Sequence, residues 1–115
     1  MPKKWPRLTQ PLRAVLEALA AASADEPVYG FRLCDLTDLG SGTVYPILER
    51  LAELGWVDST WEQGQPSGRP RRRYYRLTGL GRTEWAEARA AREARRRRWT
   101  GLVPSPPADD VRGLS

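Results

Sequence analysis

The strongest constraint on the fold is a set of apolar residues that recurs with helical spacing in the middle of the chain. Successive members are three, one, three and three residues apart and so line one helix face: Val44, Ile47, Leu48, Leu51 and Leu54. Ser41 or Thr43 is a suitable N-cap, and Gly55 stands where a left-handed residue commonly ends a helix. Pro46 lies close enough to the start to be tolerated. The sequence therefore predicts an amphipathic helix that packs against a core.

Two further helices are predicted before this one. Thr9 is a suitable N-cap for the first, and Pro11 falls in its first turn. Its apolar face repeats at helical spacing: Leu12, Val15, Leu16 and Leu19. A turn over residues 25–27 ends it, and a second helix is predicted over about residues 28–37, before a short turn over residues 38–40. The second helix supplies four apolar residues: Phe31, Leu33, Cys34 and Leu36.

Two short runs of alternating residues follow the central helix. Residues 57–62 and 72–77 each alternate in the way that is typical of strands. A connector over residues 63–70, rich in glycine and proline, joins them, so we expect a β-hairpin with a long, mobile tip. Thr78 is a suitable N-cap for a fourth helix that runs to about Trp99. In fold class the chain is therefore predicted to be mainly α with a small β-hairpin.

The positive charge of the chain comes almost entirely from arginine. Its 115 residues predict one domain with a modest core, and the formal net charge is +5. Lys3 and Lys4 are the only lysines. Arginine makes bidentate contacts with phosphates and with guanine edges, so this composition suits nucleic acid. A merely solvated basic surface is the alternative interpretation.

The shortage of cysteine and histidine argues against several classes of function. One cysteine and no histidine cannot make an internal disulfide or a zinc cluster. The commonest general base is also missing, so we expect no enzyme, no metal and no cofactor. Cys34 is expected to be a small core residue, with a redox sensor as the alternative. No segment reads as a membrane span or a signal peptide, so we expect a cytoplasmic protein.

The order of helix, helix, tight turn, helix and basic hairpin is typical of a winged helix-turn-helix. In that fold the start of the recognition helix enters the major groove of DNA, and the hairpin, or wing, reaches the flanking phosphates. The start of the predicted recognition helix offers four candidates for base or phosphate contacts: Ser41, Gly42, Thr43 and Tyr45. Arg50 lies two turns further on and is a candidate anchor to the phosphate backbone.

Arginines gather in the predicted wing. Five lie within eight residues: Arg69, Arg71, Arg72, Arg73 and Arg76. Next to a helix-turn-helix, such a run is expected to clamp phosphates, and we predict the first four as DNA contacts. The alternative is a charged strand edge that only prevents aggregation.

Several short motifs in these elements resemble those of the PadR family of bacterial regulators. They are Tyr29-Gly30, Gly42-Thr43-Val44-Tyr45-Pro46-Ile47-Leu48, Arg50-Leu51, Leu54-Gly55-Trp56-Val57, and Arg71-Arg72-Arg73-Tyr74-Tyr75-Arg76-Leu77-Thr78 with Gly81. The resemblance covers about residues 9–83. It implies a winged-helix fold, a homodimer formed through the N-terminal and C-terminal helices, and repression at a palindromic operator. It also implies DNA contacts from Ser41, Thr43, Tyr45 and the wing arginines.

The chain departs from the family pattern in two places. The link between the second and third helices is short, which predicts a tighter helix-turn-helix. The C-terminal helix is single and rich in arginine, so the chain resembles the short-tailed subgroup, and the existence of a small-molecule pocket stays open. The expected parts are a flexible basic arm (residues 1–8), a winged helix-turn-helix DNA-binding domain (residues 9–77), a dimerisation helix (residues 78–99) and a disordered tail (residues 100–115).

Tryptophans mark the predicted subunit interface. Trp85 and Trp99 are fourteen residues apart, which places them on nearly the same face of a helix. A monomer is expected to expose both, so we predict that this face packs against the partner subunit, with help from Trp5 and the first helix. The arginines at positions 89, 92 and 95–98 are interpreted as a solvated face, with a second DNA-contacting patch as the alternative.

Three functions remain under consideration. The leading hypothesis is a sequence-specific transcriptional regulator, namely a homodimeric repressor of an inverted-repeat operator in double-stranded DNA. The second is a ligand-sensing regulator whose tryptophan-lined dimer interface binds a small planar aromatic effector. The third is a non-specific architectural or single-strand binder, which would use Tyr74 and Tyr75 beside the wing arginines.

Overall fold

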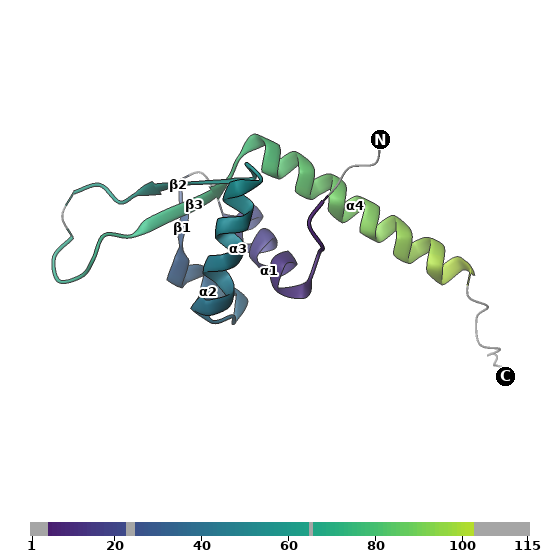
Figure 1. Cartoon of the computed structure of the whole chain (residues 1–115), viewed down its shortest axis with the longest axis horizontal. Coiled ribbons are helices and arrows are strands. Elements are labelled where there is room, and N and C mark those ends of the chain that lie inside the picture. Colours follow the sequence, from purple (N-terminus) through teal and green to yellow (C-terminus); the bar gives the residue numbers. More distant parts are fainter. Residues whose placement is uncertain (1–4, 23–24, 65, 103–115) are drawn as a thin grey trace. The chain divides into compact units, whose positions relative to one another are not determined.

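The computed structural model describes residues 5–22, 25–64 and 66–102 (Figure 1). In chain order its elements are α1 (Gln10–Ala21), β1 (Val28–Tyr29), α2 (Gly30–Thr37), α3 (Ser41–Glu53), β2 (Val57–Trp61), β3 (Arg73–Leu77) and α4 (Gly79–Leu102). The chain forms two compact units that meet within α4, since the first ends at Trp85 and the second begins at Ala86. The fold is mainly helical with one small antiparallel sheet, as expected from the sequence.

The sheet has three strands in the order β1-β3-β2, not the two of the predicted hairpin. β2 and β3 pair from Val57 with Leu77 to Trp61 with Arg73, which confirms the hairpin itself. The added strand is β1, where Val28 pairs with Tyr75 and Tyr29 with Tyr74. The prediction that residues 28 and 29 open the second helix is therefore wrong. Valine and tyrosine favour extended backbone, and a free edge of β3 is available to pair with them.

The first helix confirms its predicted start and its buried face. The Thr9 Oγ1 accepts a hydrogen bond from the Leu12 backbone N–H at 3.3 Å, as an N-cap does. All four predicted apolar residues are buried: Leu12, Val15, Leu16 and Leu19. In the part of the chain that the structure describes, α1 packs against α2, α3 and β3, so this face contributes to the core of the first unit.

The central helix α3 is confirmed, with a different cap. Its N-cap is Gly40, and neither Ser41 nor Thr43 caps the helix through its side chain. Gly55 has a φ of 78°, the left-handed conformation that was predicted for the residue ending this helix. Three of the five predicted face residues are fully buried: Val44, Leu48 and Leu51. Ile47 and Leu54, at the edges of the face, are half-buried.

The second helix buries less than the sequence suggested. Within α2 only Gly30 and Leu33 are buried, whereas the side chains of Phe31 and Leu36 are 66% and 49% exposed. Cys34 is half-buried, so the expectation of a core cysteine is wrong. The reason is geometric, because a helix of eight residues that begins at Gly30 presents only one narrow face to the core.

The start of α4 is fixed closely to the core. The Thr78 Oγ1 accepts from the Gly81 N–H at 2.9 Å, which confirms the predicted cap, and the Thr78 hydroxyl donates to the Gly55 carbonyl at 2.7 Å. A Cβ at Gly81 would overlap the backbone of Trp56, so only glycine permits this approach. The helix ends at Leu102, three residues beyond the predicted Trp99.

The predicted terminal segments lie partly outside the described residues. Of the basic arm, residues 1–4 are outside, as are residues 103–115 of the predicted tail. Pro6 is buried, and the Arg13 Nη1 donates to the Leu8 carbonyl at 2.8 Å. No helix among the described residues is long and apolar enough to cross a membrane.

Candidate nucleic-acid interface

A three-residue turn joins α2 to α3, as the short link in the sequence predicted. Asp38 adopts a left-handed conformation with a φ of 59° and accommodates the sharp change of direction. The Leu39 N–H donates to the Cys34 carbonyl at 3.3 Å, and the Thr43 N–H donates to the Gly40 carbonyl at 3.0 Å. Figure 1 shows α2 and α3 side by side, joined by this turn. The arrangement is a helix-turn-helix.

The first residues of α3 are open to solvent. Ser41, Gly42 and Thr43 are exposed, and no atom lies within 4 Å of the position that a Cβ on Gly42 would occupy. No side chain caps the first backbone N–H groups of this helix. Free N–H groups and the helix dipole attract a phosphate, and small hydroxyl side chains add donors at the same place.

Tyr45 is more firmly held than its neighbours in α3. Its ring packs so closely on Gly30 that any side chain there would overlap the ring, and Phe31 meets it edge-on with ring centroids 6.2 Å apart. Partial burial, with smaller effects of Tyr75 and Cys34, raises the pKa of the Tyr45 hydroxyl above its usual value. At neutral pH this hydroxyl therefore keeps its proton and remains a hydrogen-bond donor.

Arg50 stands at the other side of α3 and has a neighbour that the sequence did not suggest. It is exposed, and it lines a small hollow together with Pro6 and Arg7. Arg7 is separated from Arg50 by more than forty residues in sequence, so only the fold brings the two cations together. The pair extends the positive surface next to the recognition helix.

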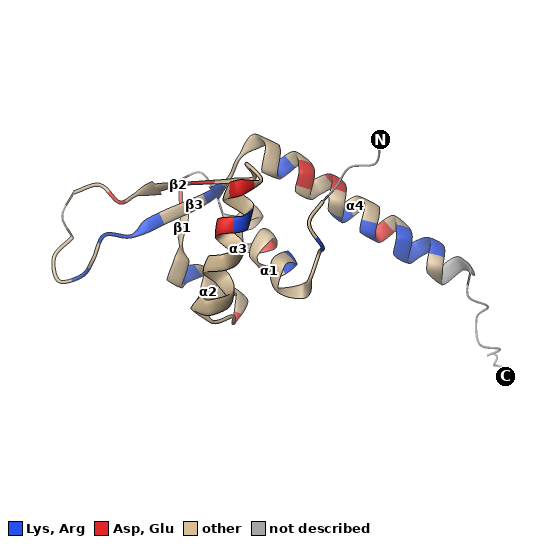
Figure 2. Ribbon diagram, in the orientation of Figure 1, with Lys and Arg blue, Asp and Glu red and all other residues tan. Residues whose placement is uncertain are grey.

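The wing is the extension of β2 and β3 beyond their last paired residues. The Glu62 N–H donates to the Arg72 carbonyl at 2.7 Å, so the two chains stay together past Trp61. Gly64 and Gly68 both have a φ near 80°, which the turns at the tip require. Figure 1 shows the hairpin extending beyond α2 and α3, and Figure 2 shows positive side chains along the β3 side of it.

Most wing arginines are engaged within the protein. The Arg69 Nη1 and Nη2 each donate to one carboxylate oxygen of Glu62 at 2.8 Å. The Arg72 backbone N–H also donates to this carboxylate, at 3.2 Å. These hydrogen bonds, first from the Arg69 side chain and then from the Arg72 backbone, lower the pKa of Glu62 from 4.5 to about 2. Glu62 therefore bridges the two sides of the wing.

Three further arginines also have fixed positions. The Arg72 guanidinium lies over the Tyr29 ring at 4.0 Å, which ties the wing to β1. The Arg73 Nε donates to the Ser59 Oγ at 2.9 Å, and its guanidinium lies 5.4 Å from the centre of the Trp61 ring. Arg76 forms an ion pair with Asp58, the residue opposite it in the sheet, at 2.8 Å.

Arg71 differs from its neighbours. Its side chain is exposed and has no hydrogen-bond or ion-pair partner among the described residues. The four predicted wing contacts are thus unequal, since Arg69 is paired, Arg72 and Arg73 are stacked, and Arg71 is available. The sequence analysis missed the acidic partners. Asp58 was detectable in principle, but only with the strand register known, and Glu62 was hidden because a turn of uncertain length separates it from Arg69.

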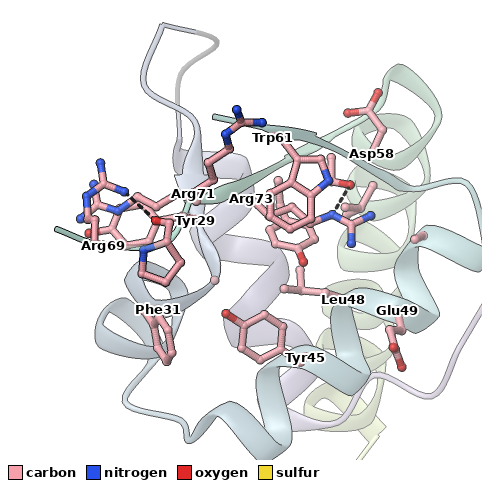
Figure 3. Close-up of a pocket in the computed structure, with 17 residues that line it drawn as sticks. Tyr29, Phe31, Tyr45, Leu48, Glu49, Asp58, Trp61, Arg69, Arg71 and Arg73 are labelled. Carbon is pink, nitrogen blue, oxygen red and sulfur yellow. Dashed lines mark hydrogen bonds between the residues drawn. The ribbon is translucent and has the colours of Figure 1, made fainter. Parts of the chain in front are cut away.

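A groove lies between the helix-turn-helix and the wing (Figure 3). Its volume is about 690 Å³, and its walls come from the start of α2, the middle of α3 and both sides of the wing. We call it the helix–wing groove. In Figure 3, Phe31 and Tyr45 lie on one side of it, and Trp61 and Arg73 lie on the other. Two of the predicted DNA-contacting regions therefore share one concave surface.

The three tryptophans predicted at a subunit interface have different surroundings. The expectation that a monomer exposes Trp85 is wrong, because this side chain is only 3% exposed within one chain. Trp85 stands one turn after Gly81, on the helix face that Gly81 brings close to Trp56. Trp5 is half-buried, and its Nε1 donates to the Glu84 Oε1 at 3.3 Å. Trp99 is 70% exposed, as expected.

A helix-turn-helix with an open, polar recognition-helix start, followed by an arginine-bearing hairpin, defines a winged helix-turn-helix DNA-binding protein. The model of the "Transcriptional regulator PadR-like family" matches residues 18–87, which is more than half of the chain. The chain therefore belongs to the PadR-like family of transcriptional regulators. It is a DNA-binding regulator of transcription and not an enzyme.

Solved structures of similar chains support the same fold. A PadR family regulator from Eggerthella lenta is 27% identical, with a TM-score of 0.66 and coverage of 84% of this chain and 88% of that one. A probable transcriptional regulator from Pseudomonas aeruginosa is 26% identical, with a TM-score of 0.63 and coverage of 84% and 68%. A PadR family regulator from Clostridium difficile, 22% identical with a TM-score of 0.62, covers 83% and 100% and shares the fold. No curated protein matches the chain.

Proposed function

We propose that this chain is a homodimeric repressor that binds an inverted-repeat operator, with the start of α3 in the major groove and the wing on the flanking backbone. The observation that carries the proposal is the open start of α3 at Ser41, Gly42 and Thr43 in the same compact unit as the exposed Arg71. A helix start that offers free N–H groups suits close approach to DNA, and an unpaired arginine suits a phosphate.

Two roles in base and backbone recognition are assigned on this basis. Ser41, Thr43 and Tyr45 are proposed to read base edges, and Tyr45 does so with a ring that Gly30 and Phe31 hold in place. Arg71 is proposed as the principal backbone contact of the wing. Arg50 joins it on the other side of α3, with Arg7 beside it.

Dimer formation is proposed through the segment over residues 78–99. Trp99 supports this, since a tryptophan exposed at 70% is costly to leave in water. Trp85, which is already buried, contributes to the core and not to this argument. We expect the wild-type chain to have the mass of a dimer at micromolar concentration and Trp99→Ala to shift it towards the monomer. A wild-type mass of one chain at that concentration would refute the dimer.

Selection of bound duplexes from a random pool tests the whole proposal. The expected result is an enriched inverted repeat whose half-sites are about one or two helical turns apart. A Thr43→Ala variant should change or weaken the enriched sequence, whereas the matched Thr83→Ala variant, at an exposed threonine of α4, should enrich the wild-type site. If the pool stays random after selection, the chain binds DNA without sequence preference and the repressor proposal fails.

A second candidate is a ligand-sensing regulator that binds planar aromatic compounds through Trp99 at the subunit interface. Its exposure favours this candidate. Binding of such a compound that is lost in Trp99→Ala and kept in Trp61→Ala would support it, and the reverse pattern would place the ligand elsewhere.

A further inference from the structure

We infer that the helix–wing groove binds a small planar aromatic compound that carries a negative charge, and that such a compound competes with DNA for the protein. The binding follows from the groove itself, whereas the competition rests on the proposed function. This site is distinct from the tryptophan-lined interface considered above, because every residue that lines it belongs to the first compact unit.

The size and the walls of the groove suit an aromatic compound. Its volume of about 690 Å³ falls within the range of small-molecule sites in proteins. Five aromatic side chains line it: Tyr29, Phe31, Tyr45, Trp61 and Tyr75. Phe31 and Trp61 are 66% and 58% exposed, although α2 and β2 each have a buried face. A flat ring placed between them would cover apolar surface that water now touches.

The charge of the groove comes from arginines in fixed positions. Arg73 is the best-placed cation, because Ser59 holds its Nε while Trp61 and Tyr75 lie beneath the guanidinium at 5.4 and 5.9 Å. Its two terminal nitrogens have no hydrogen-bond acceptor among the residues that the structure describes. A guanidinium held in this way can donate two parallel hydrogen bonds to a carboxylate or sulfonate.

The acidic residues of the groove fix the orientation of the ligand. Asp58 also lines the groove, but it is neutralised by its ion pair with Arg76. Glu49 lies on the α3 side and would repel an anion. The charged group of the ligand should therefore face Arg73 and the wing, and its ring should lie against Tyr45 and Phe31. A cationic aromatic compound is disfavoured, since four arginines line the same surface: Arg69, Arg71, Arg72 and Arg73.

Competition with DNA follows from shared residues. Tyr45 and Arg71 are proposed DNA contacts, and both also line the groove. A ligand that occupies the space between α3 and the wing would add a negative charge where the phosphate backbone must approach, so it should lower the affinity for DNA.

Calorimetric titration of the full chain, without DNA, tests the site with three probes. They are 2-naphthoate, its neutral analogue 2-naphthamide, and inorganic phosphate. We expect 2-naphthoate to bind at least about tenfold more tightly than either control, since only it offers both the ring and the charge. If phosphate binds as tightly as 2-naphthoate, the groove is only an anion contact and the inference is overturned. If 2-naphthamide binds as tightly, the charge has no role and the inference also fails.

Variants locate the site. Trp61→Ala and Arg73→Gln should each weaken 2-naphthoate at least about tenfold. Arg82→Gln, at an exposed arginine of α4 outside the groove, is the matched control and should change the affinity less than about twofold. Ala52→Phe provides a second test, because it fills the groove from an exposed position of α3 without removing a contact. Unchanged affinity in both Trp61→Ala and Ala52→Phe would refute the site.

The last measurement separates the site from the proposed function. Displacement of a labelled, selected duplex by 2-naphthoate is expected for the wild-type chain. A chain that binds 2-naphthoate but has no selected duplex keeps the site and refutes the repressor function. A chain that binds its duplex but not 2-naphthoate keeps the function and refutes the site. Simultaneous binding of both ligands refutes competition.

Discussion

Arg69 and Glu62 face each other across the wing, with both terminal nitrogens of the guanidinium donating to the two carboxylate oxygens at 2.8 Å. The carboxylate also accepts the Arg72 N–H, so one acidic residue holds three donors on the opposite side of the hairpin. A long Gly- and Pro-rich loop would otherwise sample many conformations, and ordering it has an entropic cost. The arginine-rich wing is thus given its shape by an acidic residue.

The charge of Glu62 has a direct consequence for DNA binding. Glu62→Gln should strengthen binding to random duplex and steepen its salt dependence by roughly one contact, about 0.9 in the slope of log K against log salt, because Arg69 is released for phosphate. Glu17→Gln, at an exposed position of α1, is the matched control for charge alone. Fluorescence anisotropy of a labelled duplex across a salt series measures both. An unchanged slope would show that Arg69 already contacts DNA or never does.

The same pair predicts an unusual titration. Because the folded-state pKa of Glu62 is lowered from 4.5 to about 2, its contribution to wing order is fully present above pH 4.5. It should be lost as the pH falls from 4.5 towards about 2. In Arg69→Gln the pKa of Glu62 should rise towards its ordinary value. NMR detection of the Glu62 carboxyl carbon during an acid titration measures this directly, and equal values in the two chains would contradict the prediction.

Arg71 and Arg76 provide a matched test of free and paired arginines in the wing. Arg71→Gln should weaken duplex binding and reduce the salt slope by about 0.9, since the side chain is free to contact a phosphate. Arg76→Gln removes the same charge from a residue already paired with Asp58, so its slope should change less. Equal losses in the two variants would mean that the ion pair opens on DNA.

Gly30 and Gly42 differ in the space around them, and alanine at each should separate packing from propensity. Gly30→Ala places a methyl group inside the Tyr45 ring, so we expect a loss of roughly 1–3 kcal/mol in the free energy of unfolding. Gly42→Ala meets open space within a helix and should be neutral or stabilising by up to about 1 kcal/mol. Urea unfolding of both variants decides the matter, and similar stabilities would show that Tyr45 moves aside without cost.

Elements that depend on local patterns could be predicted from the sequence. The cap of α1 at Thr9, the left-handed Gly55 and the cap of α4 at Thr78 each follow from residue types within a few positions. The buried face of α3 follows from periodicity in the same way. These features depend on chemistry that acts over one or two helical turns.

Features that depend on contacts between distant segments could not be predicted. β1 is two residues long, and only its pairing with β3 distinguishes it from the start of a helix. Trp85 has the sequence spacing of an interface residue, yet the close approach at Gly81 places it in the core. The helix–wing groove requires the position of the wing relative to α3, which no local pattern contains.

The two residues of β1 have a mechanical consequence. Tyr29 is paired to Tyr74 in the wing strand and is followed immediately by Gly30, the first residue of α2. The Arg72 guanidinium stacks on the same Tyr29. The wing therefore cannot turn as a separate flap without breaking backbone hydrogen bonds beside the helix-turn-helix. The distance between the two readers of DNA within one subunit is a fixed gauge, so any adjustment to different operator lengths must occur between subunits.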